Sequence, residues 1–156
     1  MLFRSDVSLT TTDKNVFVKE TSIFNCTTGI RLTTNTGFVV GSFTNLRIVG
    51  TITSGINLEA GGFAAIVDSA ISRSGIGVNV TGGANAAANL IGTTLYSNTT
   101  GIAVGGSTST ISGSSIVRNG TGASIAGGAL RTGCDNFIDG NTTPISGGAL
   151  SNACVQ

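Results

Sequence analysis

Short alternations of apolar and polar residues recur along the chain. The clearest are Ile56-Asn57-Leu58, Val78-Asn79-Val80 and Ile102-Ala103-Val104, and each is preceded by a glycine and followed within three residues by a double glycine. A period of two residues places alternate side chains on opposite faces of a strand. These segments therefore predict short strands that bury their Ile, Leu and Val side chains on one face.

The double glycines recur at nearly constant intervals of 20 to 23 residues, at Gly61-Gly62, Gly82-Gly83, Gly105-Gly106, Gly127-Gly128 and Gly147-Gly148. A fixed period of this size with small drift is typical of a solenoid, in which each repeat buries its apolar face only against its neighbours. The spacing therefore predicts a stack of coils.

A second apolar pattern predicts two further strands that meet at a corner. Apolar residues lie five positions apart at Val18 and Ile23, Phe43 and Ile48, Ile66 and Ile71, Leu90 and Leu95, and Ile111 and Ile116. Two residues after the first member stand Glu20, Asn45, Asp68, Gly92 and Gly113, and four of these five are types that tolerate a left-handed backbone. Because stacked strands align their side chains in columns, we expect Ile66 between Phe43 and Leu90.

These patterns predict an all-β fold, a parallel β-helix (solenoid) of five to six rungs with three short strands per rung. No segment has sustained helical apolar spacing, and an interior glycine costs a helix about 1 kcal/mol. We expect one domain over residues 1–156. It comprises the end of an earlier rung at 7–15, rungs at 16–37, 38–62, 63–83, 84–106 and 107–128, and a degenerate terminal rung with a tail at 129–156.

The two ends of the chain differ from the central repeats. Val7-Ser8-Leu9-Thr10-Thr11 mirrors Ile30-Arg31-Leu32-Thr33-Thr34 at a distance of 23 residues, so the chain is expected to start inside a rung. Nothing before Val7 could cap an open solenoid end, and we therefore expect a C-terminal fragment of a longer β-helix. Near the other end Pro144 enters the last expected strand, which predicts an edge position.

With the rungs laid out, nearly the whole chain resembles the right-handed parallel β-helix repeat proteins of the pectin-lyase-like superfamily. The segments that carry the resemblance are Asn98-Thr99-Thr100-Gly101-Ile102-Ala103-Val104 and Asp135-Asn136-Phe137-Ile138-Asp139-Gly140-Asn141. The second is similar to the terminal rung of uncharacterised bacterial secreted β-helix proteins. The resemblance implies a right-handed coil, export, and an extracellular or cell-surface location. The superfamily includes lyases, hydrolases, tailspikes and adhesin passengers, so the fold alone does not define a function.

Composition narrows the classes of partner. Only 10% of the residues are charged, the net charge is +1 and 40% are hydrophobic, which argues against disorder. The basic residues are scattered, so the clustered positive charge of a nucleic-acid-binding protein is missing. No apolar run approaches the roughly 18 residues of a membrane helix. We therefore expect no nucleic-acid partner and no membrane span.

Cysteines and asparagines offer a few candidate modification sites. Cys134 and Cys154 lie about one rung apart and could form a disulfide that leaves Cys26 unpaired, while three buried thiols are the alternative. Asn-x-Ser/Thr sequences occur at Asn25, Asn79, Asn98, Asn119 and Asn141. The repeat itself explains them, because asparagine followed by threonine suits these turns.

Candidate chemistry is sparse. The chain has no histidine, and Phe43 and Phe63 are expected in the core, so no aromatic platform for sugars is evident. Glu20 and Asp68 are expected in one column, about 9.6 Å apart, near the carboxylate separation of inverting glycosidases, but the backbone geometry of the corner already explains them. Arg73 and Arg118 also have two interpretations. They flank Ser97 in another column and could clamp an acidic polysaccharide, or they could be solvated turn residues.

The sequence thus predicts no catalytic, cofactor-binding or metal-binding residue and no cofactor. We expect a non-catalytic extracellular β-helix scaffold or ligand-presenting surface module, with a polysaccharide or cell-surface glycan as its partner. One alternative is a polysaccharide lyase or hydrolase whose active residues lie in missing N-terminal rungs. Another is a segment of a phage or adhesin fibre. The sequence defines neither the ligand nor the oligomeric state.

Overall fold

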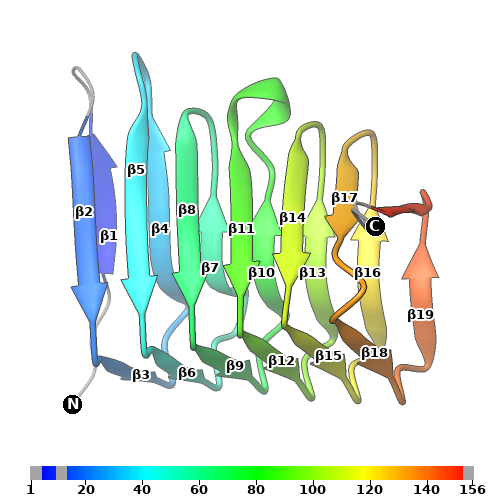
Figure 1. Cartoon of the computed structure of the whole chain (residues 1–156). Helices are drawn as coiled ribbons and strands as arrows, with labels where there is room; N and C mark the ends of the chain where they lie inside the picture. The colour runs from blue at the N-terminus through cyan, green and yellow to red at the C-terminus, as the bar shows by residue number, and fades with distance from the viewer. Residues whose placement is uncertain (1–4, 10–13, 153–156) are drawn as a thin grey trace.

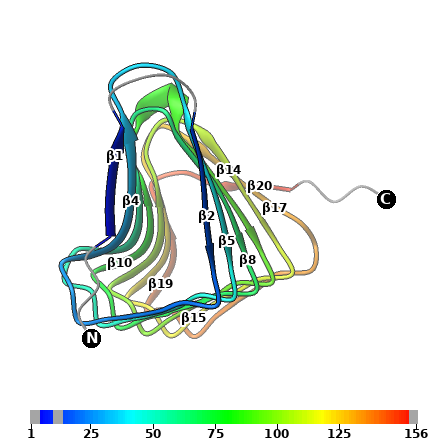
Figure 2. The ribbon, with the colours of Figure 1, turned by 90° about the vertical axis from the view of Figure 1, so that its left-hand side faces the viewer.

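The computed structural model describes residues 5–9 and 14–152, which form a right-handed parallel β-helix with six complete coils (Figure 1). Each complete coil holds three strands, one from each of three parallel sheets. Viewed close to the solenoid axis, the coils overlie one another as a triangle (Figure 2). The predicted all-β solenoid with three strands per rung is therefore confirmed.

The three sheets form the sides of the triangle. In the part of the chain that the structure describes, sheet A comprises β1 (Ser5–Leu9), β4 (Thr28–Thr34), β7 (Ser54–Leu58), β10 (Ile76–Val80), β13 (Thr100–Val104), β16 (Thr121–Ile125) and β19 (Thr143–Ser146). Sheet B comprises β2 (Lys14–Lys19), β5 (Val39–Thr44), β8 (Gly62–Val67), β11 (Ala87–Ile91), β14 (Thr108–Ser112), β17 (Ala129–Thr132) and β20 (Leu150–Asn152). The narrower sheet C comprises β3 (Ser22–Phe24), β6 (Arg47–Val49), β9 (Ala70–Ser72), β12 (Thr94–Tyr96), β15 (Ser115–Val117) and β18 (Phe137–Asp139).

The hydrophobic core fills the inside of the triangle as columns of stacked side chains. Ile66 pairs with Phe43 on one side and Leu90 on the other, as predicted, and all three side chains are fully buried. The middle residues of the sheet C strands form a second column, of Ile23, Ile48, Ile71, Leu95, Ile116 and Ile138. Burying one such aliphatic side chain contributes roughly 1.5–3 kcal/mol, so these columns stabilise the stack of coils.

The register of the first strand differs from the predicted one. Val7 lies opposite Leu32 and not opposite Ile30. A shift of two residues keeps every side chain on the same face of a strand, because the side-chain period is two. The alternation of apolar residues therefore could not distinguish these two registers.

Two sharp corners of left-handed backbone connect the strands of each coil. The first corner, between sheets B and C, was predicted, and φ lies between 48° and 60° at Glu20, Asn45, Asp68, Gly92 and Gly113. The second corner, between sheets C and A, was not predicted as left-handed. Its column comprises Asn25, Gly50, Arg73, Ser97, Arg118 and Gly140, all with positive φ.

A column of glycines on sheet A has a steric cause. A Cβ atom on Gly77 would lie 2.5 Å from the carbonyl oxygen of Gly101 in the next coil, and one on Gly101 would lie 2.6 Å from that of Gly122. Real Cβ atoms do not approach so closely, so a side chain here would separate the coils. The glycine at the second position of β4, β7, β10, β13 and β16 is therefore required by the stacking.

The remaining predictions concern the C-terminal coil and the cysteines. Pro144 lies in β19, which is an edge strand of sheet A within residues 5–9 and 14–152, as predicted. Cys26 is a buried free thiol and Cys134 is disulfide-bonded. Cys154 lies outside the described residues, so its predicted pairing with Cys134 stays a prediction.

Helix is confined to a short 3-10 turn at Gly83–Asn85, and nothing in the described ranges is a helix long and apolar enough to cross a membrane.

Candidate functional site on the outer face of sheet C

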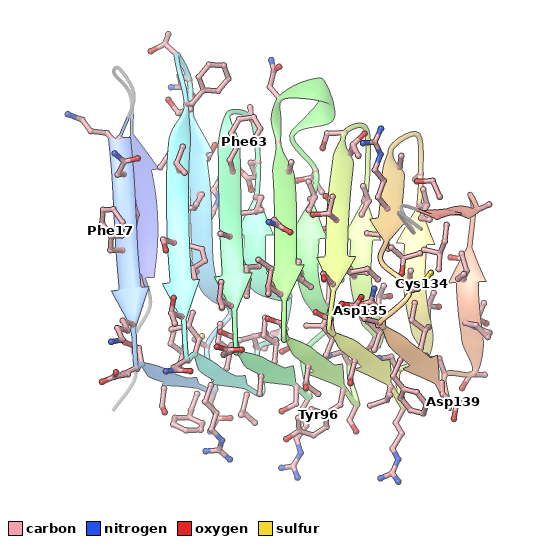
Figure 3. The ribbon with its side chains drawn as sticks, viewed as in Figure 1. Phe17, Phe63, Tyr96, Cys134, Asp135 and Asp139 are labelled. Carbon is pink, nitrogen blue, oxygen red and sulfur yellow. The ribbon has the colours of Figure 1, made fainter. Side chains whose placement is uncertain are left out.

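The outer face of sheet C carries a shallow hollow of about 440 Å³. Strands β12, β15 and β18 and the corner that follows them supply its lining, which comprises Thr94, Tyr96, Val117, Arg118, Phe137, Asp139 and Gly140. Figure 3 shows Tyr96 and Asp139 on this face, directed away from the core. The hollow combines aromatic, cationic and anionic groups in one small area.

The alternation within three-residue strands places these side chains outside. Leu95 and Ile138 point into the core, so the residues that flank each of them must face solvent. Tyr96 and Asp139 therefore share one outer column, while Thr94 and Phe137 share the neighbouring one. The two rings belong to strands that are two coils apart, about 9.6 Å along the solenoid axis. Phe137 is 59% exposed, which is unusual for so large an apolar side chain.

Arg118 lies at the edge of the hollow and is exposed. Its backbone N–H donates a hydrogen bond of 3.3 Å to the carbonyl of Asp139, which ties the corner to the next coil. In residues 14–152, no ion pair or side-chain hydrogen bond holds its guanidinium. Arg47, on the same face, differs because its guanidinium lies 5.2 Å from the ring centre of Phe24. Arg118 is thus available to a ligand.

The backbone at Arg118 is strained. Its φ is 54°, a region that L-residues other than Asn and Asp seldom adopt and that costs of order 1–3 kcal/mol. Gly50 and Gly140 occupy the same column at no such cost. Arg73 and Ser97 carry the same strain, with φ of 53° and 55°. Backbone strain of this kind clusters at functional sites, which directs attention to the arginines of this corner.

The predicted column of Arg73, Ser97 and Arg118 exists, because all three occupy equivalent positions of the second corner. The two arginines are therefore about 9.6 Å apart along the axis, by strand spacing. Both are exposed. The structure brings Arg118 to the hollow, whereas Arg73 lies one coil beyond the lining.

The candidate carboxylates Glu20 and Asp68 lie at the first corner, in one column with Asn45 between them. Glu20 is solvent-exposed and forms a 3.2 Å ion pair with Lys19. A Cβ on Gly92 would meet Oδ1 of Asp68 at 2.5 Å, so the carboxylate covers the glycine of the next coil. Neither carboxylate lines the hollow on sheet B or that on sheet C. Their positions agree with the corner explanation.

The carboxylate of Asp135 lies against the first corner of the preceding coil, at Gly113. The backbone N–H of Gly113 and the hydroxyl of Ser112 donate hydrogen bonds to its carboxylate and lower its pKa. The Ser112 Oγ to Asp135 Oδ2 distance is 2.9 Å. These bonds stabilise the ionised form at the junction of two coils. Among the described residues, no group of three or more His, Cys, Asp and Glu side chains is placed to hold a metal ion.

Three of the candidate glycosylation asparagines have a structural role. Asn98 and Asn119 are 3% and 2% exposed, and their Nδ2 atoms donate to the carbonyls of Ile71 and Leu95. Asn141 Nδ2 donates likewise to Ile116 O. A glycan attached to a buried, hydrogen-bonded amide would prevent the coils from stacking. These asparagines therefore serve the repeat, as their turn positions suggested.

Sequence reasoning missed the aromatic pair of the hollow and misplaced Phe63. The prediction that Phe63 lies in the core is wrong. Its side chain is half-buried on the outer face of sheet B, and its ring centre lies 5.5 Å from that of Phe38. Since Ile66 is inward, alternation puts Phe63 outward. The same rule, applied to Leu95 and Ile138, would have placed Tyr96 and Phe137 on one outer face.

A comparison with known protein families and one with curated proteins both found no match for this chain.

Proposed function

We propose that this chain is a non-catalytic β-helix module that binds a glycan on the outer face of sheet C and presents it at a cell surface or in the extracellular space. The observation that carries the proposal is the hollow in which Tyr96, Phe137, Arg118 and Asp139 meet. The coil architecture and the resemblance of its rungs to pectin-lyase-like, bacterial secreted proteins support the same assignment.

The side chains of the hollow suit a polyhydroxylated ligand. Aromatic rings offer flat apolar surfaces for the apolar face of a sugar ring. A guanidinium pairs bidentately with a carboxylate or sulfate, and the Asp139 carboxylate accepts hydrogen bonds from hydroxyl groups. The two rings are displaced along the solenoid axis, so an extended chain parallel to that axis contacts both of them. The ligand class is therefore a polysaccharide, and Arg118 favours an acidic one.

The absence of a carboxylate pair in the hollow supports binding without cleavage. Glycoside hydrolases generally place two carboxyl groups on either side of the scissile bond. Among the residues that the structure describes, Asp139 is the one carboxylate that lines the hollow on sheet C. The protein has no histidine that could act as a general base.

The test is a titration of the purified chain with oligosaccharides of polyuronates and of neutral glycans, with and without calcium, by isothermal calorimetry. The variant Tyr96→Ala/Phe137→Ala should weaken binding by about tenfold or more, because stacking aromatic rings dominate such contacts. Phe38→Ala is the matched control, since Phe38 is an exposed ring outside sheet C, and it should bind normally.

The outcomes separate the candidate functions. Binding that survives loss of both rings would move the ligand to another face. Release of new reducing or unsaturated ends would favour the lyase or hydrolase alternative. Failure of every glycan to bind would overturn the proposal and leave the scaffold or fibre alternatives.

A further inference from the structure

The outer face of sheet B is nearly uncharged. Its outward side chains on β2, β5, β8, β11 and β14 include one charged residue, Lys19. The exposed or half-buried apolar members are Phe17, Val40, Phe63, Ala65, Val67, Ala87 and Ile91. Arg131 on β17 ends this uncharged area. Depletion of charge is the compositional mark of the centre of a protein interface.

This face carries both a protruding ring and a hollow. Phe17 on β2 is 78% exposed. Across the strands lies a hollow of about 370 Å³, whose lining includes the small side chains Ser42, Ala65 and Ala87. Phe63 stands at the rim of the hollow, and Figure 3 shows Phe17 and Phe63 on the same face of the sheet. The ring and the hollow are separated by about 12 Å across the strands, by strand spacing.

We propose that sheet B is a homodimer interface in which Phe17 of each copy enters the hollow of the other. A two-fold interface uses the same patch on both copies, so a protrusion and a complementary hollow on one face satisfy it. The two-fold axis lies between the two sheets, nearly parallel to their strands, midway between Phe17 and the hollow. The two solenoids then lie side by side with their axes antiparallel.

The contact area between the two copies is small. Within the strands that the structure describes, the overlap extends from β2 to β11 in each copy, with a footprint on the order of 350 Å² per copy from strand spacing and rise. Protruding side chains increase the accessible area, which still lies at the low end of specific interfaces. An interface of this size belongs to the weak, transient class, so the dimer forms at high local concentration.

The symmetry has a consequence for the sheet C face. A two-fold axis parallel to the strands of sheet B preserves the direction in which they run, which is toward sheet C (Figure 1). The outer faces of both sheets C therefore look to the same side of the dimer. This step rests on the proposed function: two glycan sites on one side allow bivalent attachment to a surface, with a gain in avidity.

Sedimentation equilibrium without any glycan tests the dimer, from micromolar to millimolar protein concentration. Phe17→Asp should weaken association by about tenfold or more, because it places a charge in an apolar hollow. Ala65→Glu places a charged side chain in the hollow that receives Phe17 of the second copy, so it should weaken association by a similar factor. Phe137→Asp on sheet C is the matched control and should leave association unchanged. Circular dichroism melting confirms that each variant is folded.

A cross-linking experiment places the contact. The variant Ser42→Cys keeps Phe17 and adds one thiol per copy near the two-fold axis, on β5 in the same row as Phe17 and Ala65. Facing sheets lie about 10 Å apart, so a bismaleimide with a spacer of about 10 Å should join this thiol to its equivalent in the second copy and give a covalent dimer. A wild-type chain that stays monomeric at millimolar concentration, or a Phe17→Asp variant that associates like the wild type, would overturn the dimer. Neither result depends on whether a glycan binds.

Discussion

The early and late coils stabilise the same second corner in different ways. In the late coils the residue after the left-handed position is Asn98, Asn119 or Asn141. Asn119 Oδ1 accepts the backbone N–H of Asn98 at 2.9 Å, and its Nδ2 donates to the carbonyl of Leu95 at 3.1 Å. Each amide thus bridges to the preceding coil and satisfies backbone groups that a sharp corner leaves unpaired.

The early coils have no such amide at this position. Cys26, Thr51 and Ser74 stand there, and the backbone N–H of Ser74 donates the first bond of the ladder to Asn98 Oδ1. The Oγ1 atom of Thr51 is buried and has no hydrogen-bond partner among the described residues. Cys26 Sγ donates to Thr28 O at 3.3 Å, and burial raises the pKa of this thiol, so it stays protonated and unreactive.

The first corner shows the same contrast. In the early coils Leu46 is buried beside the large Phe43, and its N–H donates to Ser69 Oγ at 3.0 Å. In the late coils polar residues take the equivalent positions, and Ser114 N–H donates to Asn136 Oδ1 at 2.9 Å. One backbone path is therefore compatible with apolar packing in one region and with polar ladders in the other. The two regions should respond differently to mutation.

Loss of a large apolar side chain should have the largest effect. Phe43→Ala removes a fully buried ring from the early coils and should lower the free energy of unfolding by about 4 kcal/mol. Urea denaturation followed by circular dichroism measures the change. Phe17→Ala, which removes a 78% exposed ring from the neighbouring strand, should change stability by less than about 0.5 kcal/mol. Equal losses for both variants would contradict the inward column.

Removal of one asparagine side-chain amide from the hydrogen-bond ladder of the second corner should have the next largest effect on stability. Asn119→Ala leaves the N–H of Asn98 and the carbonyl of Leu95 buried without their partners, which should cost about 3 kcal/mol. The exposed loop residue Asn35 provides the control, and Asn35→Ala should be nearly neutral. Hydrogen exchange should show faster exchange at the Asn98 amide. An unchanged rate there would mean that the ladder contributes little.

The orphaned hydroxyl in the early coils predicts a stabilising mutation. Thr51→Val keeps the shape of the side chain and removes the unpaired Oγ1, so stability should rise by about 1 kcal/mol. Thr93→Val is the matched case in a late coil, where Oγ1 donates to Ile66 O at 3.0 Å, and it should lower stability by about 1 kcal/mol. The two thermal midpoints should move in opposite directions. A decrease in both would show that Thr51 Oγ1 is satisfied.

The smallest effect on stability should come from the ion pair of Arg31 and Glu59 on the outside of sheet A. Arg31 Nη2 contacts Glu59 Oε2 at 2.7 Å, and this hydrogen-bonded ion pair lowers the pKa of Glu59 below its usual range. A lowered carboxyl pKa adds stability above the unfolded-state value near 4.5, and this stability is lost as the pH falls through the folded-state pKa. Because both side chains are partly exposed, the contribution is a few tenths of a kcal/mol.

The test of this pair is the pH dependence of the urea midpoint from neutral pH down through the acidic range. Glu59→Gln should flatten that dependence slightly relative to the wild type. An unchanged profile would mean that the outer ion pair adds nothing that the buried ladder and core do not already supply.

The sequence by itself determined the repeat, the three strands per coil and the first corner. These features are local, since alternation and a residue such as Asn45 act within one coil. The identity of the second corner was less accessible, because Arg73 and Arg118 are not residue types that favour left-handed backbone. Their strained φ is held by packing between coils and was visible only in the structure.

The candidate site and the sheet B face were decided by the tertiary structure. Each combines residues from different coils, such as Tyr96 with Phe137, and which side chains meet depends on the register between strands. A register shifted by two residues preserves every apolar alternation, as the pairing of Val7 with Leu32 shows, so local pattern cannot choose between such registers. Only the stacking of complete coils, through backbone hydrogen bonds and the core columns, fixes the partners.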